Sequence, residues 1–411
     1  PEGKVLFPVH GNIYGDPGAG TSFITAFQAA IVDCGWTRCG GDPAIFYKRS
    51  KPSGKIQVLS SYVDDLSAGI CRLDQSLWQA LRARGWKFED AKPLSQFLGI
   101  HCILAGPRLV YLSQKEYLKH VVEKHEAWTG QTLKPRSTLP TGLPEFEEDT
   151  LAASAQTVTN VRGDVGGLMY GGRGTRPDVL RAIAEVASYA TKPAHHLEFL
   201  NQLMSFVKGT LDTVLVFDAR TLPRSLSEWQ TDVSADAEYR SPKCQTGIFV
   251  AISPISAAPS KPNVAAGGEV FLPLAWSTHG HRFSKLSVAE GEVVGAVHGG
   301  RAGLQTAVVY GEIALGQSPD IELDELELCQ VVRLREDNAA CELALKRGYS
   351  SQMSYISRIY KVSVAWVGER VSAGELEIQH EATDMMLGDP LTKLVVPAVF
   401  FKRKVLLLLV Q

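Results

Sequence analysis

The sequence predicts an α/β chain built from several domains, and three observations lead to this fold class. The chain has 411 residues, 45% of them hydrophobic and 21% charged, which is a globular composition long enough for two or three domains. Strand-like and helix-like segments alternate through residues 1–125 and again beyond Leu226. Between these regions, residues 126–160 are rich in Pro, Thr, Gly and Glu, which is typical of a connector.

The first region contains a clear helix signal and a strand that runs into a helix. The segment "LDQSLWQALRARGW" places apolar side chains on one helical face, namely Leu73, Leu77, Trp78 and Leu81. Gly85 is expected to end this helix. Further along, "VYLSQKEYLKHVVEKHE" is expected to begin extended and to continue as a helix.

A predicted hairpin in the same region carries two adjacent carboxylates. The stretches "KIQVL" and "SSYVDDLSAGI" are β-prone and half-apolar, with Asp64 and Asp65 at the turn. Two like charges side by side repel, and burying them is costly unless a cation or hydrogen-bond donors compensate. Because a plain surface turn more often uses Asn-Gly or Asp-Gly, the pair indicates a special function for this hairpin.

The later regions predict a helical segment followed by a second α/β region. Residues 161–212 have helical apolar spacing, as in "VLRAIAEVASYA" and "LEFLNQLMSFVKG". Beyond Leu226, the strand-like "GIFVAIS", "FLPLAW" and "VVRLR" alternate with helical stretches. The final "VVPAVFFKRKVLLLLVQ" is apolar but interrupted by Lys402, Arg403 and Lys404, so we expect a packing helix rather than a membrane anchor.

Charge and cysteine content narrow the class of protein. The formal net charge is −2, so a nucleic-acid function would depend on local patches and on metal ions rather than on a basic surface. The 7 cysteines are scattered without a C-x-x-C pair, which is typical of a reduced, intracellular chain.

The second α/β region holds acidic residues at predicted strand ends and helix starts. They are Asp232 in "EWQTDVS", Glu292 in "VAEGEVV", Asp337 in "REDNAA" and Asp389 in "LGDPLTK". Carboxylates from such positions can converge on hard divalent cations. Taken singly, each of them is more often a solvated strand end or a helix N-cap.

The order of motifs along the chain resembles a known family. "YVDD", "LSQFLGI", "YLSQKEYL", "GTRPDVLRAIAEVA", "LAWSTHGHRFSKLSVAEGEVV", "REDNAAC" and "ATDMMLGDPLTK" follow one another as do similar motifs in the Pol polyprotein of copia-type LTR retrotransposons. The match covers the reverse transcriptase and ribonuclease H portion of that family, and the chain is expected to lack its N-terminal part.

This resemblance implies a domain order. Residues 1–125 would form a partial reverse-transcriptase palm, and residues 126–225 a linker and a helical thumb or connection. Residues 226–395 would form a ribonuclease H-like domain, a mixed five-stranded sheet with flanking helices, before an apolar C-terminal tail at residues 396–411.

The resemblance also implies site residues and a cofactor. Asp64 and Asp65 match the metal-binding pair of the polymerase, which needs a further upstream aspartate that the motif order does not supply here. In the ribonuclease H region, the implied carboxylates are Asp232, with Asp236 as its alternative, Glu292, with Glu290 as its weaker neighbour, Asp337 and Asp389. The residues implied as ligands of Mg²⁺ or Mn²⁺ are the preferred ones, Asp64, Asp65, Asp232, Glu292, Asp337 and Asp389.

The function implied is two-metal hydrolysis of the RNA strand of RNA–DNA hybrids, with RNA-directed DNA polymerisation in the full-length protein. The implied partners are the hybrid, an RNA template with a DNA primer, and other parts of the polyprotein, but no membrane. The implied location is cytoplasmic, in virus-like particles, with the nucleus as a second location. The alternative is a decayed or domesticated remnant that binds nucleic acid without catalysis.

Overall fold

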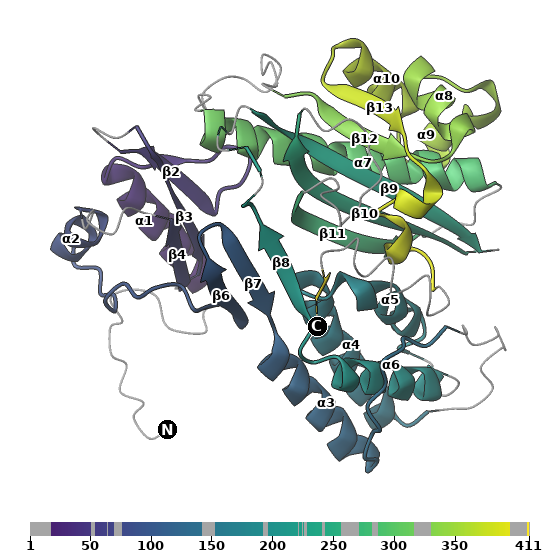
Figure 1. The fold of residues 1–411 in the computed structure, drawn as a ribbon, viewed down its shortest axis with the longest axis horizontal. Coiled ribbons are helices and arrows are strands. Elements are labelled where there is room, and N and C mark those ends of the chain that lie inside the picture. Colours follow the sequence, from purple (N-terminus) through teal and green to yellow (C-terminus); the bar gives the residue numbers. More distant parts are fainter. Residues whose placement is uncertain are drawn as a thin grey trace, which may run out of the picture. The chain divides into compact units, whose positions relative to one another are not determined.

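The computed structural model contains helices and sheets in two compact units. It describes residues 18–50, 54–63, 65–69, 76–141, 153–191, 196–220, 222–223, 225, 228–240, 243–255, 271–281, 287–315, 330–394 and 409–410. One unit comprises Pro1–Phe97 with Val308–Leu326, and the other comprises Leu98–Ala307 with Glu327–Gln411. This mixture of elements confirms the predicted α/β class with more than one unit (Figure 1).

The first unit is an antiparallel sheet with helices packed on it. Its strands follow the order β1-β2-β3-β4, with bounds Thr37–Arg38, Ile45–Arg49, Ile56–Tyr62 and Asp65–Gly69. Its helices are α1 (Ala19–Asp33), α2 (Ser76–Ala83) and a π-helical turn at Gly311–Leu315. The expected helix is confirmed in α2, which buries Leu77, Trp78 and Leu81, and Gly85 follows it with a φ of 89°.

The second unit begins with a sheet and a set of helices. Within this unit the strands follow the order β14-β8-β7-β6, with bounds Leu409–Val410, Val214–Asp218, Leu109–Ser113 and Ile100–Gly106. The two-residue strand β5 (Gln96–Phe97) falls within the residue range of the first unit. The helices are α3 (Lys115–Thr129), α4 (Ala155–Gly174), α5 (Leu180–Ser188) and α6 (Leu197–Gly209), with a 3₁₀ turn at Pro177–Val179. The predicted helical segment at residues 161–212 is therefore confirmed, as is the strand that leads into α3.

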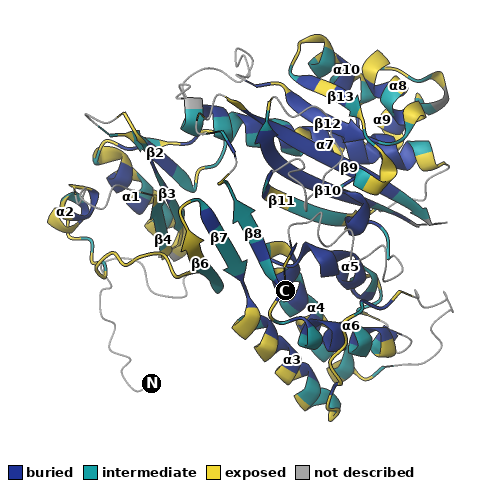
Figure 2. Ribbon diagram, viewed as in Figure 1, coloured by how far each residue is buried: buried dark blue, intermediate teal, exposed yellow. Residues whose placement is uncertain are grey.

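A second, mixed five-stranded sheet carries the acidic residues of interest. Its order is β11-β10-β9-β12-β13, with bounds Leu272–Gly280, Lys243–Pro254, Trp229–Arg240, Val332–Glu336 and Leu376–His380. β9, β10 and β11 pair antiparallel, whereas β12 pairs parallel with both β9 and β13. Figure 2 shows that β9, β10 and β12 are largely buried.

Helices cover this sheet and several short turns complete it. The helices are α7 (Val288–Tyr310), α8 (Ala339–Arg347), α9 (Ile356–Ile359) and α10 (Val364–Ser372). The turns are Ser351–Met353, Thr383–Met385 and Asp389–Leu391, the last of which is η7. Apolar residues of β9, β10, β12, β13 and these helices form one core cluster.

The predicted domain boundaries fall inside one compact unit, and the division into domains stays a prediction. The predicted divisions at residues 125/126 and 225/226 both fall inside the second unit. The physical reason is a shared core, because buried residues of α3 to α6 pack in the same cluster as Phe249, Ala251 and Leu391. Helices and sheet therefore bury their apolar faces against each other rather than separately.

The apolar end of the chain lies mostly outside the described residues. Of the expected packing helix, the structure describes Leu409–Val410, which pair antiparallel with β8 as strand β14 and are thus not helical. No described helix is both long and apolar enough to span a membrane.

Candidate metal centre

The register of two parallel strands brings two acidic residues to one level of the sheet. β12 pairs with β9 so that Arg335 lies beside Ser234. Two residues further along, Asp337 follows the end of β12 and Asp236 lies within β9. Because paired parallel strands keep their register, these carboxylates meet at the same end of the sheet.

The third carboxylate comes from α7, which lies unusually close to the sheet. A glycine recurs every fourth residue along one ridge of this helix, at Gly291, Gly295, Gly299 and Gly303. A Cβ at Gly303 would lie only 2.4 Å from a methyl carbon of Val233, so a larger residue could not be held at this separation. This close packing carries Glu292, in the first turns of the helix, to the end of β9.

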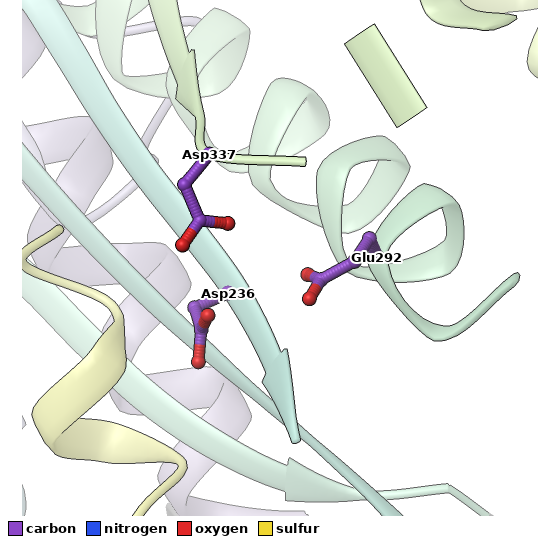
Figure 3. A group of neighbouring side chains, drawn as sticks. All are labelled: Asp236, Glu292 and Asp337. Carbon is purple, nitrogen blue, oxygen red and sulfur yellow. The ribbon is translucent and has the colours of Figure 1, made fainter. Parts of the chain in front are cut away.

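The three acidic side chains converge. One ligand oxygen from each of Asp236, Glu292 and Asp337 lies within 4.8 Å of the others. Figure 3 shows the side chains pointing toward one another from β9, α7 and the loop after β12. Asp236 and Glu292 are buried, at 1% and 5% exposure, and Asp337 is half-buried. Oxygen ligands at such separations are those that Mg²⁺ and Mn²⁺ prefer.

The local sequence explains the position of Asp337. After the buried strand β12, the side chain of Asn338 accepts hydrogen bonds from the backbone N–H groups of Ala340 and Cys341 and so caps α8. Asp337 therefore lies at the N-terminal end of this helix, next to the capping residue. The helix ends at Gly348, which adopts a left-handed φ of 65°.

Burial and neighbouring negative charges raise the pKa of two members of the group, Glu292 and Asp236. Burial, followed by the charges of Asp236, Glu336 and Asp337, raises the pKa of Glu292 to about 10. Burial also raises the pKa of Asp236 to about 6, with Asp389 and Asp337 adding to it and Lys393 opposing it. Glu292 Oε2 has no hydrogen-bond partner among the described residues, although it is buried. A bound cation would satisfy this oxygen.

Asp389 lies beside the three converging residues. It begins η7 and is fully buried. Lys393 joins it to the group, because Lys393 Nζ contacts Asp389 Oδ1 and lies 3.4 Å from Asp236 Oδ1. Burial alone lowers the pKa of Lys393, but the charges of Asp236 and Asp389 outweigh this effect and raise the pKa overall.

The structure corrects the placement of Asp232, the residue preferred as the first carboxylate. Asp232 lies four residues before Asp236 on the same face of β9, about 13 Å away along the strand. Its Oδ1 accepts a hydrogen bond from Arg335 Nε at 3.1 Å, and its Oδ2 accepts one from Ser253. It is neutralised at this other position, and the alternative residue Asp236 joins Glu292 and Asp337 instead.

The structure also separates Glu290 from Glu292. Residues two apart on a helix point in nearly opposite directions. Glu290 is fully buried and accepts hydrogen bonds from the hydroxyls of Tyr355 and Tyr360. The weaker neighbour of Glu292 is therefore engaged elsewhere in the core.

Of the predicted polymerase pair, the structure describes one member. Asp64 lies outside the described residues. Asp65 begins β4, where it pairs with Tyr62, and it is exposed. Tyr62 and Val63 beside it are also exposed, at 60% and 47%. The described part of the turn is thus solvated, so burial does not by itself require a cation here, and the metal-binding role of both aspartates stays a prediction.

Some residues of the centre were not assigned from the sequence. Thr392 donates a hydrogen bond to Asp236, and Lys393 contacts Asp236 and Asp389. The spacing of Asp389 and Lys393, four residues apart, was the available signal for an ion pair. Glu336 is fully buried beside Asp337, with Oε1 accepting from the Asn338 N–H at 3.0 Å. No sequence signal separated Glu336 from an ordinary strand end.

Comparisons with known proteins agree with the motif order. The chain is 23% identical over 394 residues to the retrovirus-related Pol polyprotein from transposon TNT 1-94 of Nicotiana tabacum. The alignment covers 93% of this chain but only 27% of that polyprotein's length. No protein-family model matches the chain, and no solved structure matches it either. The predicted resemblance is therefore confirmed: over nearly its whole length, the chain is similar to a Pol polyprotein of a retrotransposon.

Proposed function

We propose that the second α/β region, at about residues 226–395, hydrolyses the RNA strand of RNA–DNA hybrids with the help of two Mg²⁺ or Mn²⁺ ions. The observation that carries this proposal is the convergence of Asp236, Glu292 and Asp337, whose oxygens lie within 4.8 Å of one another. The similarity to a Pol polyprotein supports a retroelement origin and hence a nucleic-acid substrate.

The side chains present fit divalent metal ions. The donor atoms are carboxylate oxygens, which are the ligands that hard cations such as Mg²⁺ and Mn²⁺ prefer. Softer metals prefer sulfur and nitrogen ligands instead. The buried Glu292 Oε2, which has no hydrogen-bond partner among the described residues, needs a positive partner when Glu292 is ionised. Asp236, Glu292 and Asp337 would hold an ion between them, with Asp389 at the side of Asp236.

The chain's own residues would hold and orient the reacting groups. Metal ions in such a site activate a water molecule and stabilise charge on the phosphate. The parallel pairing of β9 and β12 fixes the spacing of Asp236 and Asp337, and the close packing of α7 fixes Glu292. Because these elements are rigid, the ligand geometry is set before substrate binds.

The polymerase function is proposed for the full-length protein rather than for this chain alone. It depends on Asp64 and Asp65, whose adjacency in "YVDD" resembles the metal-binding turn of reverse transcriptases. RNA template, DNA primer and other parts of the polyprotein are its proposed partners, and cytoplasmic particles and the nucleus are its proposed locations.

Cleavage of a labelled hybrid by the full chain tests the hydrolytic proposal. We expect cleavage in Mg²⁺ or Mn²⁺, with Asp236→Asn and Asp337→Asn each lowering the rate about a hundredfold or more, because one anionic ligand is lost. Asp232→Asn is the matched control, since it lies on the same strand and is paired with Arg335. It should cleave at close to the wild-type rate when circular dichroism shows it folded.

Other results would overturn parts of the proposal. If the folded wild-type chain binds the hybrid but cleaves it with neither Mg²⁺ nor Mn²⁺, the chain is a remnant that binds nucleic acid without catalysis. If Asp232→Asn abolishes cleavage while Asp236→Asn does not, the ligand set is wrong.

A further inference from the structure

The segment "DPLTK" lays a lysine ammonium against two carboxylates of the candidate metal centre. Lys393 Nζ lies 3.4 Å from Asp236 Oδ1 and contacts Asp389 Oδ1. The hydroxyl of Thr392 donates a hydrogen bond to Asp236 Oδ2. One short segment therefore engages both oxygens of Asp236, the carboxylate that lies between the other acidic residues.

Two glycines build this contact into the fold. A Cβ at Gly247 would lie 2.5 Å from the carbonyl oxygen of Gly388, and a Cβ at Gly388 would lie 2.9 Å from the backbone nitrogen of Asp236. The backbone before η7 thus lies directly on β9 and β10. Asp389 begins this turn and Lys393 follows its end, and the Lys393 side chain reaches back to both Asp389 and Asp236.

The side chain of Lys393 is more exposed than those of Asp236 and Asp389, so it is the one of the three that can move. The side chains of Asp236 and Asp389 are 1% and 0% exposed, whereas that of Lys393 is 31% exposed. The carboxylates are therefore fixed in the core, and the ammonium sits on a flexible stem at the edge of the site. It can leave the two carboxylates without rearrangement of the sheet.

We infer that Lys393 is an internal counter-ion that occupies the place of the second divalent ion. This inference rests on the proposed function. One ion binds at Asp236, Glu292 and Asp337, where Glu292 offers an oxygen with no hydrogen-bond partner among the described residues. A second ion, between Asp236 and Asp389, binds only when the ammonium leaves. Lys393 is thus a positioning residue that sets the strength of the second metal site.

Manganese titration of the full chain tests this role without an activity measurement. Isothermal calorimetry, with electron paramagnetic resonance of free Mn²⁺ as a second readout, gives the number of bound ions and their affinities. Lys393→Met keeps the length of the stem but removes the charge, and Lys393→Gln is a second, polar form of the same change. We expect both to strengthen the second site about tenfold or more, because a competing charge is gone.

Two further variants separate charge from structure. Lys393→Arg keeps a positive charge and should titrate like the wild type. Lys346→Met, on α8, removes a lysine that pairs with Glu342 rather than with the site, and it should also titrate like the wild type. If Lys393 had only a structural role, both Lys393→Arg and Lys393→Met would change the Mn²⁺ titration.

The outcomes distinguish failure of this inference from failure of the proposed function. If the wild type binds Mn²⁺ and both neutral variants show an unchanged or weaker second site, Lys393 is not a competing cation and the inference is overturned. If neither the wild type nor any variant binds Mn²⁺, the metal centre itself is absent and the proposed function is overturned with it.

Discussion

Replacing Glu336 by glutamine should make the stability of the sheet in the candidate centre less sensitive to a rise in pH from about 4.5 to about 8. Glu336 is fully buried, and its Oε2 has no hydrogen-bond partner among the described residues. Burial, with the charges of Asp337 and Asp236 adding to it, raises its pKa from 4.5 to about 8, against the opposing hydrogen bonds from Asn338 and Cys341. The folded chain therefore retains a proton that the unfolded chain has already released.

The sign and size of the effect follow from this difference in pKa. Because the folded state binds the extra proton, the contribution of Glu336 to the stability of the fold is fully present below about pH 4.5. This contribution is lost progressively as the pH rises to about 8. At 1.36 kcal/mol for each pH unit, the total loss is on the order of 5 kcal/mol. Glutamine keeps the shape of the side chain and cannot ionise. At about pH 8, Glu336→Gln should therefore be more stable than the wild type by this amount.

Hydrogen exchange of metal-free protein measures this gain. Peptides covering β9 and β12 report the opening of this sheet separately from the rest of the chain. The opening free energies of variant and wild type should nearly coincide at about pH 5 and diverge up to about pH 8, with EDTA present throughout. Glu116→Gln, at an exposed site on α3, is the control and should show no such divergence. A difference between Glu336→Gln and wild type that stays constant with pH would refute the reasoning.

Three other perturbations test the packing and the charges of the same unit. Gly303→Ala should lower the free energy of unfolding by about 1–3 kcal/mol in denaturant titration, because its Cβ would lie 2.4 Å from a methyl carbon of β9. Gly300→Ala is the control and should be tolerated, because its Cβ would lie 3.5 Å from the nearest atom. Mg²⁺ should raise the melting temperature of the chain, and Asp236→Asn should reduce that increase, because it removes a shared ligand; an equal increase in both would contradict the metal centre. Arg176→Met should destabilise the chain by about 3–5 kcal/mol in the same titration, because it leaves the buried charge of Asp178 uncompensated, and a change below about 1 kcal/mol would show that this pair contributes little.

The sequence by itself determined the elements whose signals are local. The apolar spacing of Leu77, Trp78 and Leu81 predicted α2, and the glycine after it predicted its end. The helices at residues 161–212 and the strand leading into α3 were likewise predictable. Such features depend on side-chain periodicity within a few turns, which the sequence displays directly. Domain boundaries were not predictable in this way, because they depend on which apolar faces share a core.

Only the tertiary structure decided which carboxylates meet. Motif order selected Glu292 and Asp337, and both lie in the converging group. It preferred Asp232 to Asp236, whereas Asp236 lies in the converging group. The alternation of strand side chains could not correct this preference, because residues four apart on a strand lie on the same face. The parallel register of β12 on β9 makes the choice, since it sets Arg333 beside Asp232 and carries Asp337 to the level of Asp236. β9 and β12 are not joined by a turn, because β10, β11 and α7 lie between them in the chain, so no local turn signal specifies their register.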